Sequence, residues 1–246
     1  MIIKFLGTGS NGGIPQLDCR CINCETARKF NGWQRLRSCL AFSENAKDWT
    51  IIDCGPDFNR QLSFLNILMQ DIKSVTMTHL HPDHSIGLTE FGFGKPHGIQ
   101  IEVAKTMQKE MRQNSMFNHL FEVGFTKFAT TNNFKFVPIS HWPNHSCQAI
   151  VFGKSTKVLF ASDCAIIDDK LLAQMQKVDL IIFDGTFLNE SKFNHLAIKD
   201  SCPILTKLKK PVIFTHINHS ENEKEITKFI KKFGFKLAFD GMEVNI

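Results

Sequence analysis

Several short apolar segments of this chain end in a residue whose side chain can bind a metal ion. Seven segments have the length and apolar character of buried strands. Rigid scaffolds place reactive groups in loops at strand ends, so ends that meet at one edge of a sheet would form a site. The segments are 2–6, 50–53, 75–79, 149–152, 158–163, 180–184 and 212–216, and five of them end in Asp53, His79, Asp163, Asp184 and His216.

Helical patterns lie between these strand candidates. The clearest runs over 220–233, where Ser220 and Glu223 form a capping-box pair, the apolar residues share one face, and Gly234 ends the pattern. Segments 56–68 and 197–208 are further candidates. Strands and helices in one chain indicate a mixed α/β architecture with helices on the sheet faces. With no linker or repeat, we expect a single domain over residues 1–246.

Composition excludes several classes of protein. A chain of 246 residues with 43% hydrophobic and 22% charged residues is typical of a globular domain. It has no apolar run of about 18 residues and no secretory leader, so we expect no membrane span. The net charge of +5 favours an anionic substrate, but no Lys/Arg cluster predicts a nucleic-acid surface. Eight cysteines without a leader favour a reducing, cytoplasmic location.

The strongest local signal is the segment Thr-His-Leu-His-Pro-Asp-His at 78–84. Imidazole nitrogens and carboxylate oxygens are the usual ligands of zinc, iron and manganese. Alternate side chains of one loop can face two adjacent points, so this segment can serve two ions. A solvated histidine-rich turn is the alternative, but the apolar strand before the segment favours metal binding.

One segment cannot complete two coordination spheres, so ligands from distant segments are needed. The candidates are His145 before a strand and Asp163 and His216 at strand ends. Three further histidines, His97, His119 and His141, lack such a context. We interpret His97 and His119 as loop residues. We interpret His141, beside Trp142, as structural.

Three closely spaced cysteines predict a second kind of metal site. Cys19, Cys21 and Cys24 lie in a loop at about 18–25. A tetrahedral structural zinc needs a fourth ligand, and His219, three residues after His216, is the best candidate. The site would fasten the N-terminal loop to the loop that carries His216. Free thiols, or Cys21 and Cys24 as a redox pair, remain the alternatives.

The chain resembles the metallo-β-lactamase superfamily, since H-x-H-x-D-H, a later histidine, an aspartate after an apolar strand and a last histidine occur in that family's order. The resemblance implies an α/β (α+β) fold, an αββα sandwich of two mixed sheets flanked by helices, with the site at one edge. It also implies two divalent ions (zinc, manganese or iron) and a homodimer. Residue by residue, it assigns His79, His81 and His145 to one ion, Asp83, His84 and His216 to the other, and Asp163 to a bridge between them.

Two subfamilies resemble this chain most. PhnP-type phosphodiesterases carry C-x-C-x-x-C and T-H-I-x-H segments, matched here at 19–24 and 215–219. The PqqB family of pyrroloquinoline quinone (PQQ) biosynthesis is matched at 12–16, 57–62 and 240–242. Typical PqqB members lack the full H-x-H-x-D-H motif, so its presence here favours a two-metal hydrolase.

The implied reaction is hydrolysis of a small anionic phosphodiester, such as a cyclic or ribosyl phosphate. Two ions clamp an oxyanion and lower the pKa of a bridging water towards ~7, and the hydroxide attacks phosphorus. We assign catalytic roles to Asp83, Asp163 and His195, with His195 as the general acid that protonates the leaving oxygen. Asp53 and Asp184 are either supports of the ligand histidines or ordinary strand-end carboxylates.

Other functions share parts of this pattern. A PqqB-like metal-dependent oxygenase, or a related role in PQQ biosynthesis, is the main alternative. A thioester hydrolase uses the same ligand pattern. For tRNA 3′-end processing, the interval between His84 and His145 lacks a basic, glycine-rich arm. A zinc-stabilised module without activity would not need the intact ligand set.

Overall fold

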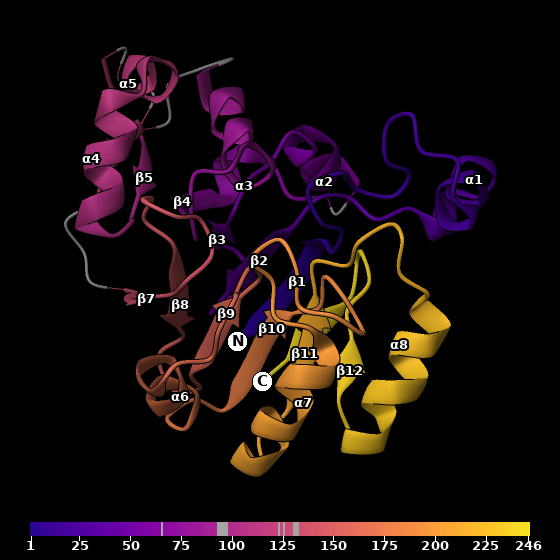
Figure 1. Cartoon of the computed structure of the whole chain (residues 1–246). Coiled ribbons are helices and arrows are strands. Elements are labelled where there is room, and N and C mark those ends of the chain that lie inside the picture. The colour runs from indigo at the N-terminus through magenta and orange to yellow at the C-terminus, as the bar shows by residue number, and fades with distance from the viewer. Residues whose placement is uncertain (65, 93–97, 123, 125, 130–132) are drawn as a thin grey trace.

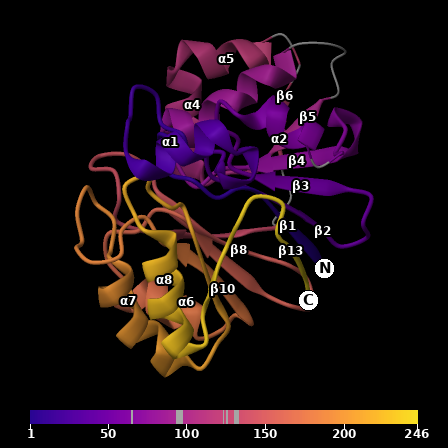
Figure 2. The ribbon, with the colours of Figure 1, turned by 90° about the vertical axis from the view of Figure 1, so that its right-hand side faces the viewer.

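Two mixed β-sheets pack face to face, and helices cover their outer faces (Figures 1 and 2). The computed structural model describes residues 1–64, 66–92, 98–122, 124, 126–129 and 133–246, so His97 lies outside the described residues. The four-layer αββα sandwich implied by the resemblance is confirmed.

The first sheet has seven strands in the described residues, in the order β13-β1-β2-β3-β4-β5-β6. Strands β13 to β3 pair antiparallel, and β3 to β6 pair parallel. The bounds are β1 Ile2–Gly7, β2 Cys39–Ser43, β3 Trp49–Ile52, β4 Ile72–Thr76, β5 Ile99–Ile101, β6 Thr126–Phe128 and β13 Glu243–Asn245.

The second sheet has six strands in the described residues, in the order β12-β11-β10-β9-β8-β7. Strands β9 to β12 pair parallel, and β7, β8 and β9 pair antiparallel. The bounds are β7 Lys135–Pro138, β8 Gln148–Phe152, β9 Val158–Ala161, β10 Leu180–Asp184, β11 Val212–Thr215 and β12 Lys236–Leu237.

Helices α2, α4 and α5 pack on the outer face of the first sheet, and α6, α7 and α8 on that of the second. Figure 2 shows the two helical layers on opposite sides of the paired sheets. No helix within the described part of the chain is long and apolar enough to span a bilayer. His119, expected in a loop, is exposed on α5. The bounds are α1 Ile22–Lys29, α2 Phe58–Phe64, α3 Pro82–Ser85, α4 Lys105–Gln113, α5 Ser115–Glu122, α6 Asp169–Met175, α7 Ile198–Leu205 and α8 Glu223–Ile230.

The strands are apolar on both faces because each sheet is covered on both sides. In β2, Leu40 and Phe42 belong to the core between the sheets, whereas Cys39 and Ala41 belong to the core under the helices. This alternation follows from the two-residue period of a strand. Both faces of the central strands are therefore filled, and polar side chains with chemical roles collect at the strand ends.

The helix expected at 220–233 begins later than the capping-box pattern indicates. The N-cap is Asn222, whose side chain accepts hydrogen bonds from the backbone N–H groups of Lys224 and Glu225. The Ser220 hydroxyl instead donates to the side chain of Asn218. An asparagine nearer the first turn provides the same acceptor and moves the start of the helix by about three residues.

Candidate metal centre

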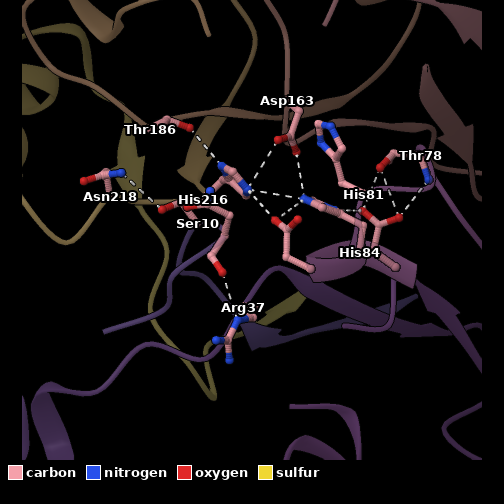
Figure 3. Close-up of polar contacts among 12 residues, drawn as sticks. Ser10, Arg37, Thr78, His81, His84, Asp163, Thr186, His216 and Asn218 are labelled. Atoms are coloured by element: carbon pink, nitrogen blue, oxygen red, sulfur yellow. Dashed lines mark hydrogen bonds and ion pairs between the residues drawn. The ribbon is translucent and has the colours of Figure 1, made fainter. Parts of the chain in front are cut away.

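Loops from several strands converge at one edge of the sandwich and bring together six of the seven residues expected to bind two ions. Figure 3 shows Asp163 facing both His84 and His216, which come from distant parts of the chain. Ligand atoms within 4.8 Å of one another define overlapping groups of three. These groups include His79–His81–His141, His79–His84–Asp163 and Asp83–His84–His216.

Two buried imidazoles of this cluster point ring nitrogens at each other. His84 Nε2 and His216 Nε2 are 3.3 Å apart. His84 Nδ1 is 2.8 Å from the Asp53 carboxylate, which accepts a hydrogen bond from this nitrogen. The hydroxyl of Thr186 donates to Asp184 and can therefore accept from His216 Nδ1 at 2.8 Å. Both Nε2 atoms thus face one point, an arrangement that a cation stabilises.

A second group of histidines is oriented in the same way, by hydrogen bonds to the outer ring nitrogens. The Thr78 hydroxyl donates to Asp53 and accepts from His79 Nδ1 at 2.9 Å. The carbonyl oxygen of Asn194 accepts from His141 Nδ1 at 3.0 Å. The Nε2 atoms of His79 and His141 are left as lone-pair donors, 2.8 Å and 3.3 Å from His81 Nδ1. Hydrogen bonds to the outer nitrogens therefore orient these rings for metal binding.

The prediction for His145 is corrected by the structure, which places His141 in the cluster instead. The His145 side chain is 40% exposed and lies 3.4 Å from the carboxylate of Glu110. Its ring stacks on Trp142 at 3.6 Å between centroids, and Trp142 in turn lies against His81 at 4.1 Å between centroids, with the rings tilted by 36°. His141, interpreted from the sequence as structural, instead lies in the cluster, with its Nε2 3.3 Å from His81 Nδ1 and 3.6 Å from Asp163 Oδ1. Both histidines lie in one loop before β8, and local sequence does not distinguish them.

Replacing each of these two histidines separately tests the correction. We expect His141→Ala to weaken zinc binding at the cluster by at least ~100-fold, because the loss of a directly facing nitrogen exceeds the usual ~10–100-fold effect of an outer partner. We expect His145→Ala to change it by less than about threefold, as for an exposed side chain. Competition with a chromophoric chelator measures both. Equal losses in the two variants would contradict the assignment.

The Asp163 carboxylate lies between the two histidine groups. Its Oδ1 is 3.3 Å from His216 Nε2 and 3.6 Å from His141 Nε2, and its Oδ2 is 3.3 Å from His84 Nε2. Oδ2 is buried and has no hydrogen-bond partner among the described residues. A buried, unsatisfied carboxylate oxygen is costly unless a cation compensates it, so this atom fits a metal ion.

The charges of the cluster favour a bound cation. Burial would raise the pKa of Asp163, but His216 and His84 outweigh it and hold that pKa well below its usual value. Burial would lower the pKa of His84, but Asp163 and Asp83 outweigh it and raise that pKa well above its usual value, so His84 Nε2 holds a proton that a bound metal ion would replace. In contrast, burial and the neighbouring His141 lower the pKa of His81 to about 4, which keeps that ring neutral.

The loop after β3 orients His84 and, through Thr78, His79. Asp53, at the end of β3 with φ of 63°, accepts hydrogen bonds from the backbone N–H and hydroxyl of Thr78 as well as from His84. Helix α3 packs closely on this loop, where a Cβ at Gly55 would lie 2.0 Å from the carbonyl oxygen of Asp83. Glycine is required there because the backbones approach so closely. Asp53 therefore supports the cluster from outside it.

His195 borders the cluster and pairs with a buried carboxylate. Its Nδ1 is 2.7 Å from Asp184 Oδ2, and its Nε2 is 3.9 Å from Asp163 Oδ1. Burial disfavours the charged form, but Asp184 outweighs burial and raises the pKa of His195 to about 9. Asp184 also accepts from the backbone N–H groups of Cys164 and Thr186. Like Asp53, Asp184 holds a histidine of the site in one orientation.

The cysteine loop and His219 come together at a separate place. His219 Nδ1 lies 3.3 Å from Cys19 Sγ and 3.5 Å from Cys21 Sγ, and the four ligand atoms, with Cys24, lie within 4.8 Å of one another. The side-chain amide of Asn23 also donates to the carbonyl of His219 at 2.8 Å. Three thiols and one imidazole are a donor set that suits tetrahedral zinc.

Residues of the metal cluster and His219 of the cysteine site line one cleft. Its volume is about 610 Å³, and its walls include residues of the metal cluster, His195 and the loop from His216 to Ser220. A small anionic molecule could reach the cluster from this cleft, because Asp83, Asp163 and His216 form part of its lining.

Residues 48–217 match the Beta-lactamase superfamily domain, and the chain therefore belongs to this superfamily. Among curated relatives, Coenzyme PQQ synthesis protein B of Acinetobacter baylyi is 24% identical over 304 aligned positions that cover 100% of both chains. The protein of the same name from Klebsiella pneumoniae (strain 342) is 25% identical and covers 100% of this chain and 98% of its own.

Solved structures show the same fold. Zinc-bound PqqB from Methylobacterium extorquens superposes with a TM-score of 0.84 at 18% identity, covering 100% of both chains. A diphosphatase from the PhnP family superposes with a TM-score of 0.80 at 22% identity, covering 100% of this chain and 97% of the other. The resemblance to both subfamilies is confirmed, and these likenesses define the fold.

Proposed function

We propose that this protein is a binuclear metal-dependent hydrolase that cleaves a phosphodiester bond in a small anionic substrate. Two divalent cations in the cluster would clamp the phosphate oxygens and acidify a water molecule. Zinc fits this donor set, as do manganese and iron. One ion would be held by His79, His81 and His141, the other by Asp83, His84 and His216, and Asp163 would contact both.

The observation that carries the proposal is the pairing of His195 with Asp184 beside this cluster. Hydrolysis adds water to phosphorus and breaks a P–O bond, and the departing oxygen needs a proton. Asp184 orients the His195 ring so that Nε2 faces the cleft near Asp163. His195 can donate its proton to the leaving oxygen, which yields an alcohol and a phosphomonoester. A binding module would have no use for a proton donor in this position.

A leaving-group series tests both the activity and the role of His195. We expect the zinc- or manganese-loaded protein to hydrolyse bis(p-nitrophenyl) phosphate. In His195→Gln, turnover of an alkyl ester should fall ~10²–10⁴-fold, because an alkoxide needs a proton. Turnover of the p-nitrophenyl ester should fall much less, because p-nitrophenolate is already a stable anion. Rates are followed by absorbance and by phosphomonoester release.

The variant Asn218→Ala is a matched control, because Asn218 also lines the cleft, while its side-chain amide donates to Ser10 and its side-chain oxygen accepts from Ser220. It should slow the two esters equally. Absence of turnover with either metal would overturn the hydrolase proposal. An equal loss for both esters in His195→Gln would remove His195 as the proton donor.

The full-length relatives support a second candidate, a role in the synthesis of coenzyme PQQ. They carry that name and align with the chain over its whole length. A metal-dependent oxygenase of this kind would consume oxygen, whereas a hydrolase would not. Oxygen uptake by the metal-loaded protein with a peptide substrate, together with failure to cleave phosphodiesters, would favour this role.

We also propose that Cys19, Cys21, Cys24 and His219 bind one structural zinc. The closed set of four ligands leaves no position for substrate. The ion would fasten the N-terminal loop to the segment between His216 and His219, which forms one wall of the cleft.

A further inference from the structure

A two-residue turn beside the cleft holds a phenylalanine in a conformation that its side chain disfavours. Lys192 and His195 pair through two backbone hydrogen bonds of 3.2 Å and 3.0 Å. The turn residues between them, Phe193 and Asn194, have φ of 51° and 61°. Such turns favour glycine, asparagine and aspartate, so Asn194 fits but a bulky phenylalanine does not.

Packing inside the protein does not explain this phenylalanine. The Phe193 side chain is 78% exposed, although exposure of so large an apolar group is unfavourable. Its ring lies 6.1 Å from the ring of Phe187, at an angle of 49°. Phe187 in turn meets the ring of His195 edge-on at 6.0 Å. Phe193 therefore extends, into the cleft, an aromatic wall that begins beside the proposed proton donor.

The charge on this wall suits an anionic ligand. Lys192 is the only lysine or arginine among the described residues that line the cleft. Its ammonium group lies 4.5 Å from the centre of the Phe187 ring, which holds it at the aromatic wall. The wall thus combines a flat, open ring face with one positive charge.

We propose that the hairpin of residues 192–195 binds a planar aromatic ring of the substrate, with Phe193 as the stacking surface. This inference rests on the proposed function, because the phosphoryl group at the metal cluster places the remainder of the substrate. The ring lies on the His195 side, where the leaving group departs. The substrate class is then a phosphodiester that carries an aromatic ring close to phosphorus. Aromatic rings stack favourably on an exposed ring face, which an aliphatic group cannot match.

Binding of two phosphonates that hydrolases of this type do not cleave tests the inference. Calorimetric titration compares phenylphosphonate with methylphosphonate on the zinc-loaded protein. We expect phenylphosphonate to bind about tenfold more tightly, as one stacking contact allows. Phe193→Trp should keep this preference, whereas Phe193→Gly and Phe193→Leu should lose most of it. Methylphosphonate affinity should stay nearly constant.

Thermal unfolding and a second exposed phenylalanine control the experiment. Phe193→Gly should unfold at the same temperature or higher, since glycine adopts this turn without strain. Phe239→Leu changes a side chain that is 59% exposed and lies outside the cleft, and it should keep the phenyl preference.

A phenyl preference that persists in Phe193→Gly, or no preference in the unmodified protein, overturns the inference. Failure of both phosphonates to bind does the same. Because no bond is broken, these outcomes are independent of turnover. A protein that prefers phenylphosphonate yet hydrolyses no diester would contradict the proposed function and leave the aromatic subsite standing.

Discussion

We expect Asp163→Ala to lower the proposed phosphodiester turnover by at least ~10³-fold and to reduce the number of metal ions bound per chain. Asp163 lies within 3.3 Å of both His84 and His216, and its buried Oδ2 has no hydrogen-bond donor among the described residues. Its negative charge would compensate both cations. Loss of a directly contacting carboxylate exceeds the ~10–100-fold effects of outer partners.

Metal analysis and initial rates on the same preparation measure this result. Asp48→Asn is the control, because that carboxylate is about half exposed and pairs with Lys73 on the surface. It should retain full activity and metal content. The role of Asp163 fails if the alanine variant keeps two tightly bound ions and a near-normal rate, since the histidines alone would then suffice.

We expect Cys19→Ser to remove one zinc ion per chain and to lower the unfolding temperature by roughly 8–16 °C. A ligand present at ~1,000 times its Kd stabilises the folded state by about 4 kcal/mol, and about 2–4 °C corresponds to each kcal/mol in a domain of this size. Serine is a poor zinc ligand, and Cys19 is one of two thiols beside His219 Nδ1. The zinc-mediated link between the loop of Cys19 and the loop of His219 would be lost.

The effect should reach the cleft as well. His219 lies three residues after His216, and both line the cleft, so a loosened loop should also weaken the second active-site ion. Cys202→Ala is the control, since that cysteine is buried in α7, where no metal site is expected. It should keep three zinc ions, even if the loss of a buried side chain costs some stability. An unchanged zinc count in Cys19→Ser would show that the cysteines bind no metal.

Local sequence predicted the strands well because their signal is local. The segments that end at Asp53, Asp163, Asp184 and His216 match observed strands to within two residues, whereas β4 begins and ends three residues before the strand expected at 75–79. Each is a run of apolar side chains that must be buried on both faces. The edge strand β12 and the short β5 and β6 carry too few apolar residues to produce such a signal, and their pairing depends on the rest of the sheet.

The ligands of the candidate metal centre could be predicted from the sequence only where they lie in one motif. The motif at 78–84 identifies its own candidate ligands because they lie on one loop. His141 and His145 lie in another loop with similar surroundings, and only the fold decides between them. His141 is turned inward by its bond to the Asn194 carbonyl, whereas His145 faces Glu110. Asn194 lies 53 residues away, so no local pattern could reveal that contact.

Supporting residues were harder to recognise than the ligands. Thr78 and Thr186 each accept a hydrogen bond from a histidine and donate one to a buried aspartate. Threonine after a strand is common, so neither residue stands out in the sequence. The sequence allows two interpretations of Asp53 and Asp184, as supports of histidines or as ordinary strand-end carboxylates. The structure places both against histidines of the site.

Anomalous diffraction from crystals of the zinc-loaded protein, collected above and below the zinc absorption edge, would locate the bound ions. We expect two peaks roughly 3.5–4 Å apart. One should lie by His79, His81 and His141, the other by Asp83, His84 and His216, with Asp163 between them. A single peak, no peak in the cluster, or a peak beside His145 would contradict the binuclear centre.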